Sequence, residues 1–199
     1  MPTYGQLFSY GFKKTKENFF FLFGLLVIFA LLSVLNSTVQ AALVGIGVLV
    51  FFVGLAFSLV QVLFELGFLK IMLKLIAGTK PTYRDLYLHY PQFIDFLLAG
   101  LIMGLLIAGG FILLILPGIY LAIRLQFTPL FVADKGLKPV DAVKGSWELT
   151  KGKWMKVFVF DLLTVGINIL GLLALVVGLL VTIPMTSLAY VYFYKKLQG

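Results

Sequence analysis

The stretch LPGIYLAIRLQFTPLFVADKGLKPVDAVKGSWELTKGK, residues 116–153, decides the predicted fold. Its first half is apolar enough to lie inside a membrane, and the chain leaves that membrane at Asp134. Its second half is basic and amphipathic, as segments that lie on a membrane surface are. The stretch therefore predicts a span, a surface segment and the entry of the next span, and we expect this unit to recur along the chain.

Composition places the chain among multi-pass membrane proteins. Of the 199 residues, 61% are hydrophobic and 12% are charged, whereas a soluble domain is about 45–50% apolar and about a quarter charged. The formal charge is +8, from 16 Lys+Arg against 8 Asp+Glu. Because these charges lie between apolar runs, we expect membrane lipids with anionic headgroups as partners, and no nucleic acid.

The apolar runs predict an all-α, polytopic integral membrane protein, because one span takes about 20 apolar residues. We expect a single membrane domain, residues 1–199, with six transmembrane helices arranged as three hairpins and the first apolar run retained rather than cleaved as a signal peptide. Gly109-Gly110 marks the predicted turn of the second hairpin. The predicted spans are residues 19–38, 42–69, 93–108, 111–133, 154–170 and 173–195.

Three amphipathic segments are predicted on one side of the membrane, at residues 3–17, 82–91 and 138–151. Thr82 begins the second as a helix cap, with Asp85 three residues later. The third has the features of an interfacial helix, which we assign to Trp147, Thr150, Lys151 and Lys153. A protein partner that docks at these segments on the cytoplasmic face is the alternative to a purely lipid-facing role.

The cationic residues predict the orientation. All Lys and Arg except Arg124 lie in the N-terminal segment, the two inner loops and the C-terminus or within three residues of them, and the predicted outer turns carry no charge. The positive-inside rule then places both termini in the cytoplasm.

Two sequence matches predict an internal repeat. One constant shift along the chain superposes Gly104 on Gly171 and Pro117 on Pro184. Since the copies would share one orientation, they predict a parallel pseudo-repeat around the membrane normal. We expect Pro117 and Pro184 to kink the helices that contain them.

The sharpest candidates for a site are the charges inside the predicted spans. A charged side chain at the centre of a span costs at least about 2.5–3.5 kcal/mol. We therefore predict an intramembrane polar cluster in which Arg124 pairs with Asp161 or Glu65. Asp95 lies on the same side. The cluster is either a salt bridge that ties helices together or a headgroup or ion site open to the cytoplasm.

Small residues recur every fourth position at Gly100, Gly104 and Ala108. This spacing is typical of close helix packing, within one subunit or in a homo-oligomer. Groups for catalysis are sparse, since His89 is the single histidine and the chain has no cysteine. We expect no metal, no cofactor and no enzymatic activity.

The motifs LILPGIYLAIRLQFTPLFVADKG and KPVDAVKGSWELTKGK resemble a group of bacterial and archaeal membrane domains. The group comprises the membrane domains attached to glycerophosphoryl diester phosphodiesterases and their stand-alone relatives, including the YciC-like inner-membrane proteins. The shared residues are Pro117, Gly118, Ile119, Arg124, Asp134, Ser146, Thr150, Lys151, Gly152 and Lys153. The resemblance implies a six-span protein of a bacterial or archaeal cytoplasmic (inner) membrane. It does not imply phosphodiesterase activity, which belongs to a separate soluble barrel.

Two functions follow as hypotheses. The first is a non-enzymatic, lipid-interacting or partner-binding membrane module. The second is a transporter or channel for a small molecule or ion, with a polar site around Arg124 and Asp161.

The orientation predicts a labelling pattern. Because the chain has no cysteine, Lys80→Cys and Lys144→Cys each introduce a single thiol. We expect a membrane-impermeant maleimide to label both only from the cytoplasmic side, with the unmodified chain as the blank. Labelling of either thiol from outside alone would overturn the orientation.

Overall fold

The computed structural model describes residues 2–174 and 177–199, and all regular elements within these ranges are helices. Five helical segments are long and apolar enough to cross a membrane, so this is an all-helical chain of multi-pass type. The sixth predicted span, residues 173–195, includes positions outside the described ranges. Its described part, mostly α9, is not among the five, so the six-span topology stays a prediction. The helices are α1 (Tyr4–Glu17), α2 (Phe19–Ala42), α3 (Gly47–Ile76), η1 (Tyr83–Leu86), η2 (Tyr90–Gln92), α4 (Phe93–Leu113), α5 (Ile115–Leu125), α6 (Thr128–Lys135), α7 (Pro139–Thr150), α8 (Trp154–Leu173) and α9 (Leu179–Gln198).

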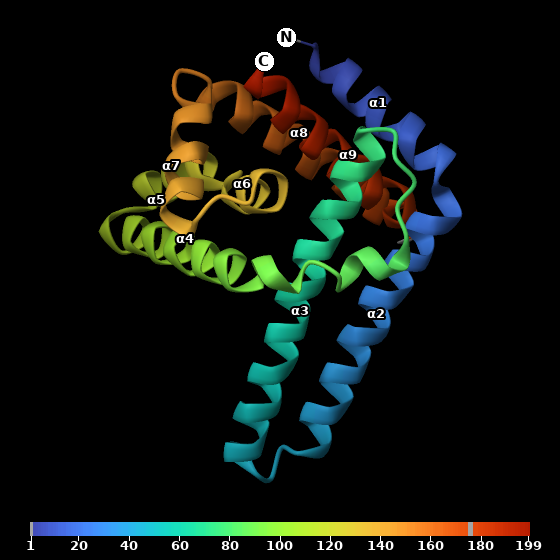
Figure 1. Cartoon of the computed structure of the whole chain (residues 1–199), viewed down its shortest axis with the longest axis vertical. Coiled ribbons are helices and arrows are strands. Elements are labelled where there is room, and N and C mark those ends of the chain that lie inside the picture. Colours follow the sequence, from blue (N-terminus) through green and yellow to red (C-terminus); the bar gives the residue numbers. More distant parts are fainter. Residues whose placement is uncertain (1, 175–176) are drawn as a thin grey trace.

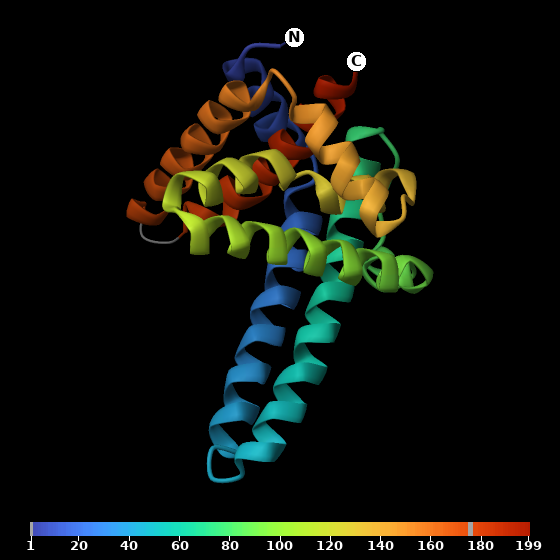
Figure 2. The same ribbon diagram turned by 90° about the vertical axis from the view of Figure 1, so that its left-hand side faces the viewer.

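The α2–α3 hairpin extends away from a body formed by the other helices (Figure 1). The helix pair α4–α5 runs across this hairpin rather than along it, in both views (Figure 2). The two termini lie together at the end opposite the α2–α3 turn (Figure 1). A parallel repeat around one axis is therefore not confirmed, because the α2–α3 hairpin and the α4–α5 pair run in different directions.

The polar residues 36–40 predict the turn between the first two spans, but α2 continues through them to Ala42. The hydroxyls of Ser37 and Thr38 donate to the carbonyl of Val34 at 2.9 and 2.8 Å, so these side chains are satisfied within the helix. Polar side chains that bond to the preceding turn do not need to end a helix. The chain reverses instead between Ala42 and Gly47.

The second hairpin also turns later than predicted, at the extended residue Leu114 rather than at Gly109-Gly110. Gly110 is instead buried against α5, where an added Cβ would lie 3.0 Å from Gly118 Cα. The predicted kink at Pro117 is wrong, because Pro117 lies in the first turn of α5, where the missing N–H has no helical partner to lose. Pro184 does lie inside α9, as predicted.

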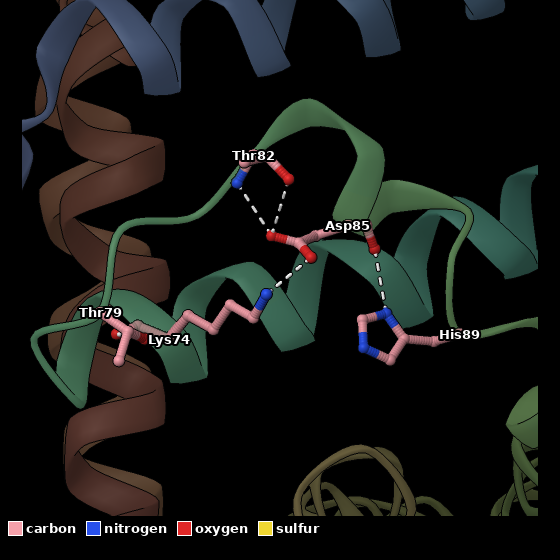
Figure 3. Close-up of polar contacts among 5 residues, drawn as sticks. All are labelled: Lys74, Thr79, Thr82, Asp85 and His89. Carbon is pink, nitrogen blue, oxygen red and sulfur yellow. Dashed lines mark hydrogen bonds and ion pairs between the residues drawn. The ribbon is translucent and has the colours of Figure 1, made fainter.

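The loop after α3 holds two 3₁₀ turns, η1 and η2, instead of the helix predicted over residues 82–91. The predicted cap is confirmed: Asp85 accepts from the backbone N–H of Thr82 at 2.8 Å (Figure 3). Asp85 is 3% exposed and also accepts from Lys74 Nζ at 2.6 Å, which ties the loop to the end of α3 (Figure 3). Both interactions are carboxylate hydrogen bonds, the stronger kind.

The buried core lies in the body, where α1 packs along α9. Tyr10 stacks on Tyr192 at 4.0 Å between ring centroids, and Phe8 stacks on Phe160 at 5.2 Å. The α2–α3 hairpin and the outer faces of α4 and α8 expose large apolar side chains such as Leu31, Phe51, Leu105, Ile112 and Leu173. Apolar surface on this scale is stable in lipid and not in water.

Candidate functional site

The predicted fourth span is broken between α5 and α6, at Gln126 and Phe127. A break inside a membrane leaves backbone groups that the protein must satisfy, since lipid offers no hydrogen bonds. Here α7 satisfies them: Ser146 Oγ donates to the carbonyl of Arg124 at 2.9 Å and accepts from the N–H of Phe127 at 3.2 Å. The Thr150 hydroxyl lies 3.2 Å from the same Arg124 carbonyl.

The side chain of Arg124, on α5, forms a hydrogen bond to α7. Its Nη2 donates to the carbonyl of Trp147 at 2.7 Å, in the last turn of α7, and its Nη1 donates to Tyr120 Oη at 3.1 Å. The guanidinium carbon lies 4.0 Å from the Trp147 ring centroid and 5.6 Å from that of Tyr120. Each of the two helices therefore supplies hydrogen bonds to the C-terminal end of the other. We call this set of Arg124, Tyr120, Ser146, Trp147 and Thr150 the α5–α7 clamp.

The predicted pairing of Arg124 with Asp161 or Glu65 is wrong. Arg124 is 4% exposed, and no carboxylate lies within ion-pair distance of it in the described ranges. A cation over a desolvated ring gains about 2 kcal/mol, and a helix C-terminus gives up to about 2 kcal/mol. At these upper values the two gains offset the cost of about 2.5–3.5 kcal/mol for the charge in a span.

The third amphipathic segment differs from its predicted role in one respect. The helix is confirmed as α7, with Pro139 in its first turn, but Thr150 is buried and Trp147 is half-buried against Arg124. These two side chains pack on protein instead of lipid. Lys151, by contrast, is exposed, and Lys153 Nζ donates to the carbonyl of Leu197 at 3.0 Å.

Asp161 lies in a separate cavity of about 360 Å³ with mixed polar and apolar walls, between α3, α8, α9 and the α5–α6 break. It accepts from Gln126 Nε2 at 2.7 Å, and the carbonyl of Gln126 accepts from Tyr190 Oη at 2.7 Å. Thr164 also lines this cavity, and within the described chain its enclosed hydroxyl has no hydrogen-bond partner. The arrangement offers oxygen ligands for a cation or a proton path.

Neither Glu65 nor Asp95 lines the Asp161 cavity or bonds to Arg124. Asp95 pairs with Lys138 at 3.1 Å near the surface. Glu65 lines an apolar cavity of about 400 Å³ together with Gly100 and Gly104. The four predicted charges thus do not form one cluster, because each helix turns its charge toward a different neighbour.

The predicted packing face of Gly100, Gly104 and Ala108 meets no partner helix among the residues that the structure describes. A Cβ added at Gly100 or Gly104 would meet nothing within 4 Å, and Ala108 is exposed. The close approach of α4 to α5 occurs at Gly110 and Gly118 instead. Sequence spacing identifies small residues, but it does not show which face the partner helix meets.

The hydrogen bonds of Ser146, Gln126 and Tyr190 were not predicted from the sequence. One signal was available: Ser146 and Thr150 are hydroxyl residues four apart on one face of a helix, where they can serve one shared acceptor. Nothing local to Gln126 or Tyr190 indicated their contacts, which join positions 35 and 64 residues apart.

Comparison with known proteins finds relatives over part of the chain. The chain is 32% identical over 103 residues to the uncharacterised protein Mb2590 of Mycobacterium bovis and 33% identical over 103 residues to the uncharacterised protein Rv2560 of Mycobacterium tuberculosis. These matches cover 52% and 50% of this chain, and in each case only 32% of the relative. No protein-family model and no solved structure matches. Membership in the group of membrane domains named above therefore stays a prediction.

The α5–α7 clamp predicts that removal of one hydroxyl group, that of Ser146, destabilises the folded protein. Ser146→Ala removes the partner of the Phe127 N–H and one partner of the Arg124 carbonyl, both buried. We expect the free energy of unfolding to fall by about 1–3 kcal/mol, the cost of an unsatisfied buried polar group. Thermal unfolding in detergent measures it, with the exposed Ser9→Ala as the matched control. Equal midpoints for the two variants would contradict the clamp.

Proposed function

We propose that this chain is a non-enzymatic integral membrane module of a bacterial or archaeal cytoplasmic membrane, which engages anionic lipid headgroups through the basic end of its helical body. Both termini are cytoplasmic in this proposal, and six helices cross the bilayer. An acidic protein partner would use the same basic surface. The single observation that carries the proposal is the separation of apolar and basic surfaces along the molecule.

This separation is visible in the arrangement of the helices. The turn of the α2–α3 hairpin lies at one end, whereas α1, the end of α3 and the C-terminus lie at the other (Figure 1). Exposed cationic side chains belong to this second end and to the loops and helix α7 beside it. They include Lys13, Lys16, Lys80, Arg84, Lys144 and Lys196. A bilayer that covers the apolar hairpins therefore meets the basic end at its headgroup level, where each Lys or Arg contributes about 1 kcal/mol toward anionic lipid.

In this proposal Arg124 does not bind lipid. All hydrogen bonds described for its guanidinium go to Tyr120 and Trp147 inside the protein. Its Nε is enclosed and has no partner within the described residues, but Arg124 lines none of the cavities described above. Arg124 supports the fold in this proposal, and the exposed basic residues support binding.

The proposal predicts lipid-dependent stability. In detergent supplemented with phosphatidylglycerol, we expect the thermal midpoint to rise relative to phosphatidylcholine, since ligands that bind the folded state stabilise it. The difference should shrink at about 1 M salt, where the Debye length is about 3 Å. Thermal unfolding of the purified chain measures both effects. Identical midpoints in the two lipids would remove the lipid role.

The Asp161 cavity favours a second candidate, cation transport. Its carboxylate has no cationic partner in the described chain, and it shares the cavity with the side chains of Gln126 and Thr164. We expect proteoliposomes to pass protons or monovalent cations, and Asp161→Asn to abolish the flux. The exposed Asp141→Asn is the matched control. If the unsubstituted chain gives no flux above empty liposomes, this candidate falls.

A further inference from the structure

A second polar cavity, separate from those above, lies where the ends of α3, α6 and α9 meet. Its volume is about 460 Å³. The polar lining consists of Lys70, Lys74, Thr79, Asp134 and Lys195, and the remaining walls are aliphatic. No residue of the α5–α7 clamp or of the Asp161 cavity takes part in it. We call it the basic cavity.

The charges of the basic cavity do not balance. Lys74 is held by Asp85 at 2.6 Å (Figure 3), and Lys195 is held by Asp134 at 2.7 Å. Lys70 is half-buried and makes no hydrogen bond or ion pair with any residue that the structure describes. Two carboxylates therefore face three ammonium groups, and the excess is one positive charge. One monoanion would neutralise it.

The ion pairs Lys74–Asp85 and Lys195–Asp134 fix two of the ammonium groups that line the basic cavity. Asp85 is fixed by the backbone and hydroxyl of Thr82 as well as by Lys74, so the Lys74 ammonium is anchored on one side (Figure 3). Asp134 accepts from Tyr194 Oη at 3.2 Å in addition to both contacts from Lys195. Lys74 and Lys195 each keep ammonium hydrogens beyond those used in these pairs, since an ammonium group has three donors.

The depth of the basic cavity matches a lipid headgroup. Lys70 lies about 35 Å along α3 from Gly47, at 1.5 Å per residue. The hydrocarbon core of a bilayer is about 30 Å thick. If α3 enters the hydrocarbon at Gly47, Lys70 reaches the polar layer on the cytoplasmic side, with aliphatic walls toward the membrane. Basic pockets at this level between helices bind lipid phosphates.

We propose that the basic cavity binds a phosphate group through Lys70, with Lys74 and Lys195 as flanking donors. The phosphate belongs to an anionic phospholipid or is free inorganic phosphate, and the two share the same chemistry. The proposal rests on the proposed function and gives it a specific site. It differs from general attraction to the basic end, because one half-buried lysine in the cavity should matter more than an exposed one.

The test is a titration of the purified full chain in detergent with short-chain phosphatidylglycerol, short-chain phosphatidylcholine and inorganic phosphate, followed by native mass spectrometry. Lys70→Gln removes the uncompensated charge, and Lys70→Arg keeps it. Lys144→Gln removes an exposed charge outside the cavity as the matched control. We expect Lys70→Gln to weaken phosphatidylglycerol binding about tenfold or more, Lys144→Gln to weaken it by no more than about fivefold, as the loss of one exposed surface charge does, and Lys70→Arg to stay within about twofold.

The outcomes separate the site from the function. Competition by millimolar inorganic phosphate at the same cavity would identify free phosphate as the ligand, and its absence would identify the lipid. Equal small losses for Lys70→Gln and Lys144→Gln would overturn the site and leave the proposed function standing. No preference of the unsubstituted chain for phosphatidylglycerol would overturn both. Thermal unfolding of each variant confirms that it is folded before binding is compared.

Discussion

A peptide group that leaves a helix inside a membrane must find its hydrogen bonds in the protein, and the body of this molecule is arranged around one such place. The chain breaks between α5 and α6, and α7 covers the break with the hydroxyls of Ser146 and Thr150. Arg124 reaches back to the end of α7. Because lipid cannot replace these partners, α7 must pack inward, and the segments on either side of it are positioned accordingly.

The clamp also explains how a cation is held without an acid. Helix carbonyls and aromatic faces supply the negative potential around Arg124, so its charge is neutralised by groups that cannot be protonated. The carboxylates are consequently left for other surroundings. Asp161 lies with an amide in a polar cavity, whereas Asp85 and Asp134 each hold a lysine at the basic end.

Lipid and water favour different surfaces, and the molecule has an apolar region and a polar region accordingly. Large apolar side chains remain exposed along the hairpins, where dispersion with lipid replaces burial. The packed core and the ion pairs gather near the termini. A headgroup layer at this boundary offers phosphate to the lysines and hydrocarbon to the aliphatic walls beside them. The basic cavity presents both kinds of surface within one site.

Features that depend on neighbouring residues could be predicted from the sequence. Apolar length predicted the membrane-capable helices, Thr82 and Asp85 predicted a cap, and the amphipathic pattern of residues 138–151 predicted α7. Prediction from the sequence was wrong where a residue is compatible with more than one local structure. Ser37 and Thr38 bond within α2 instead of ending it, and Pro117 begins a helix instead of bending one. The contact of Arg124 with Trp147 rather than Asp161, and the position of Lys70 at a cavity whose other lysines are already paired, follow from the packing of the helices. Such contacts join residues far apart in the chain, and their formation depends on the angle at which helices cross, which no local pattern encodes.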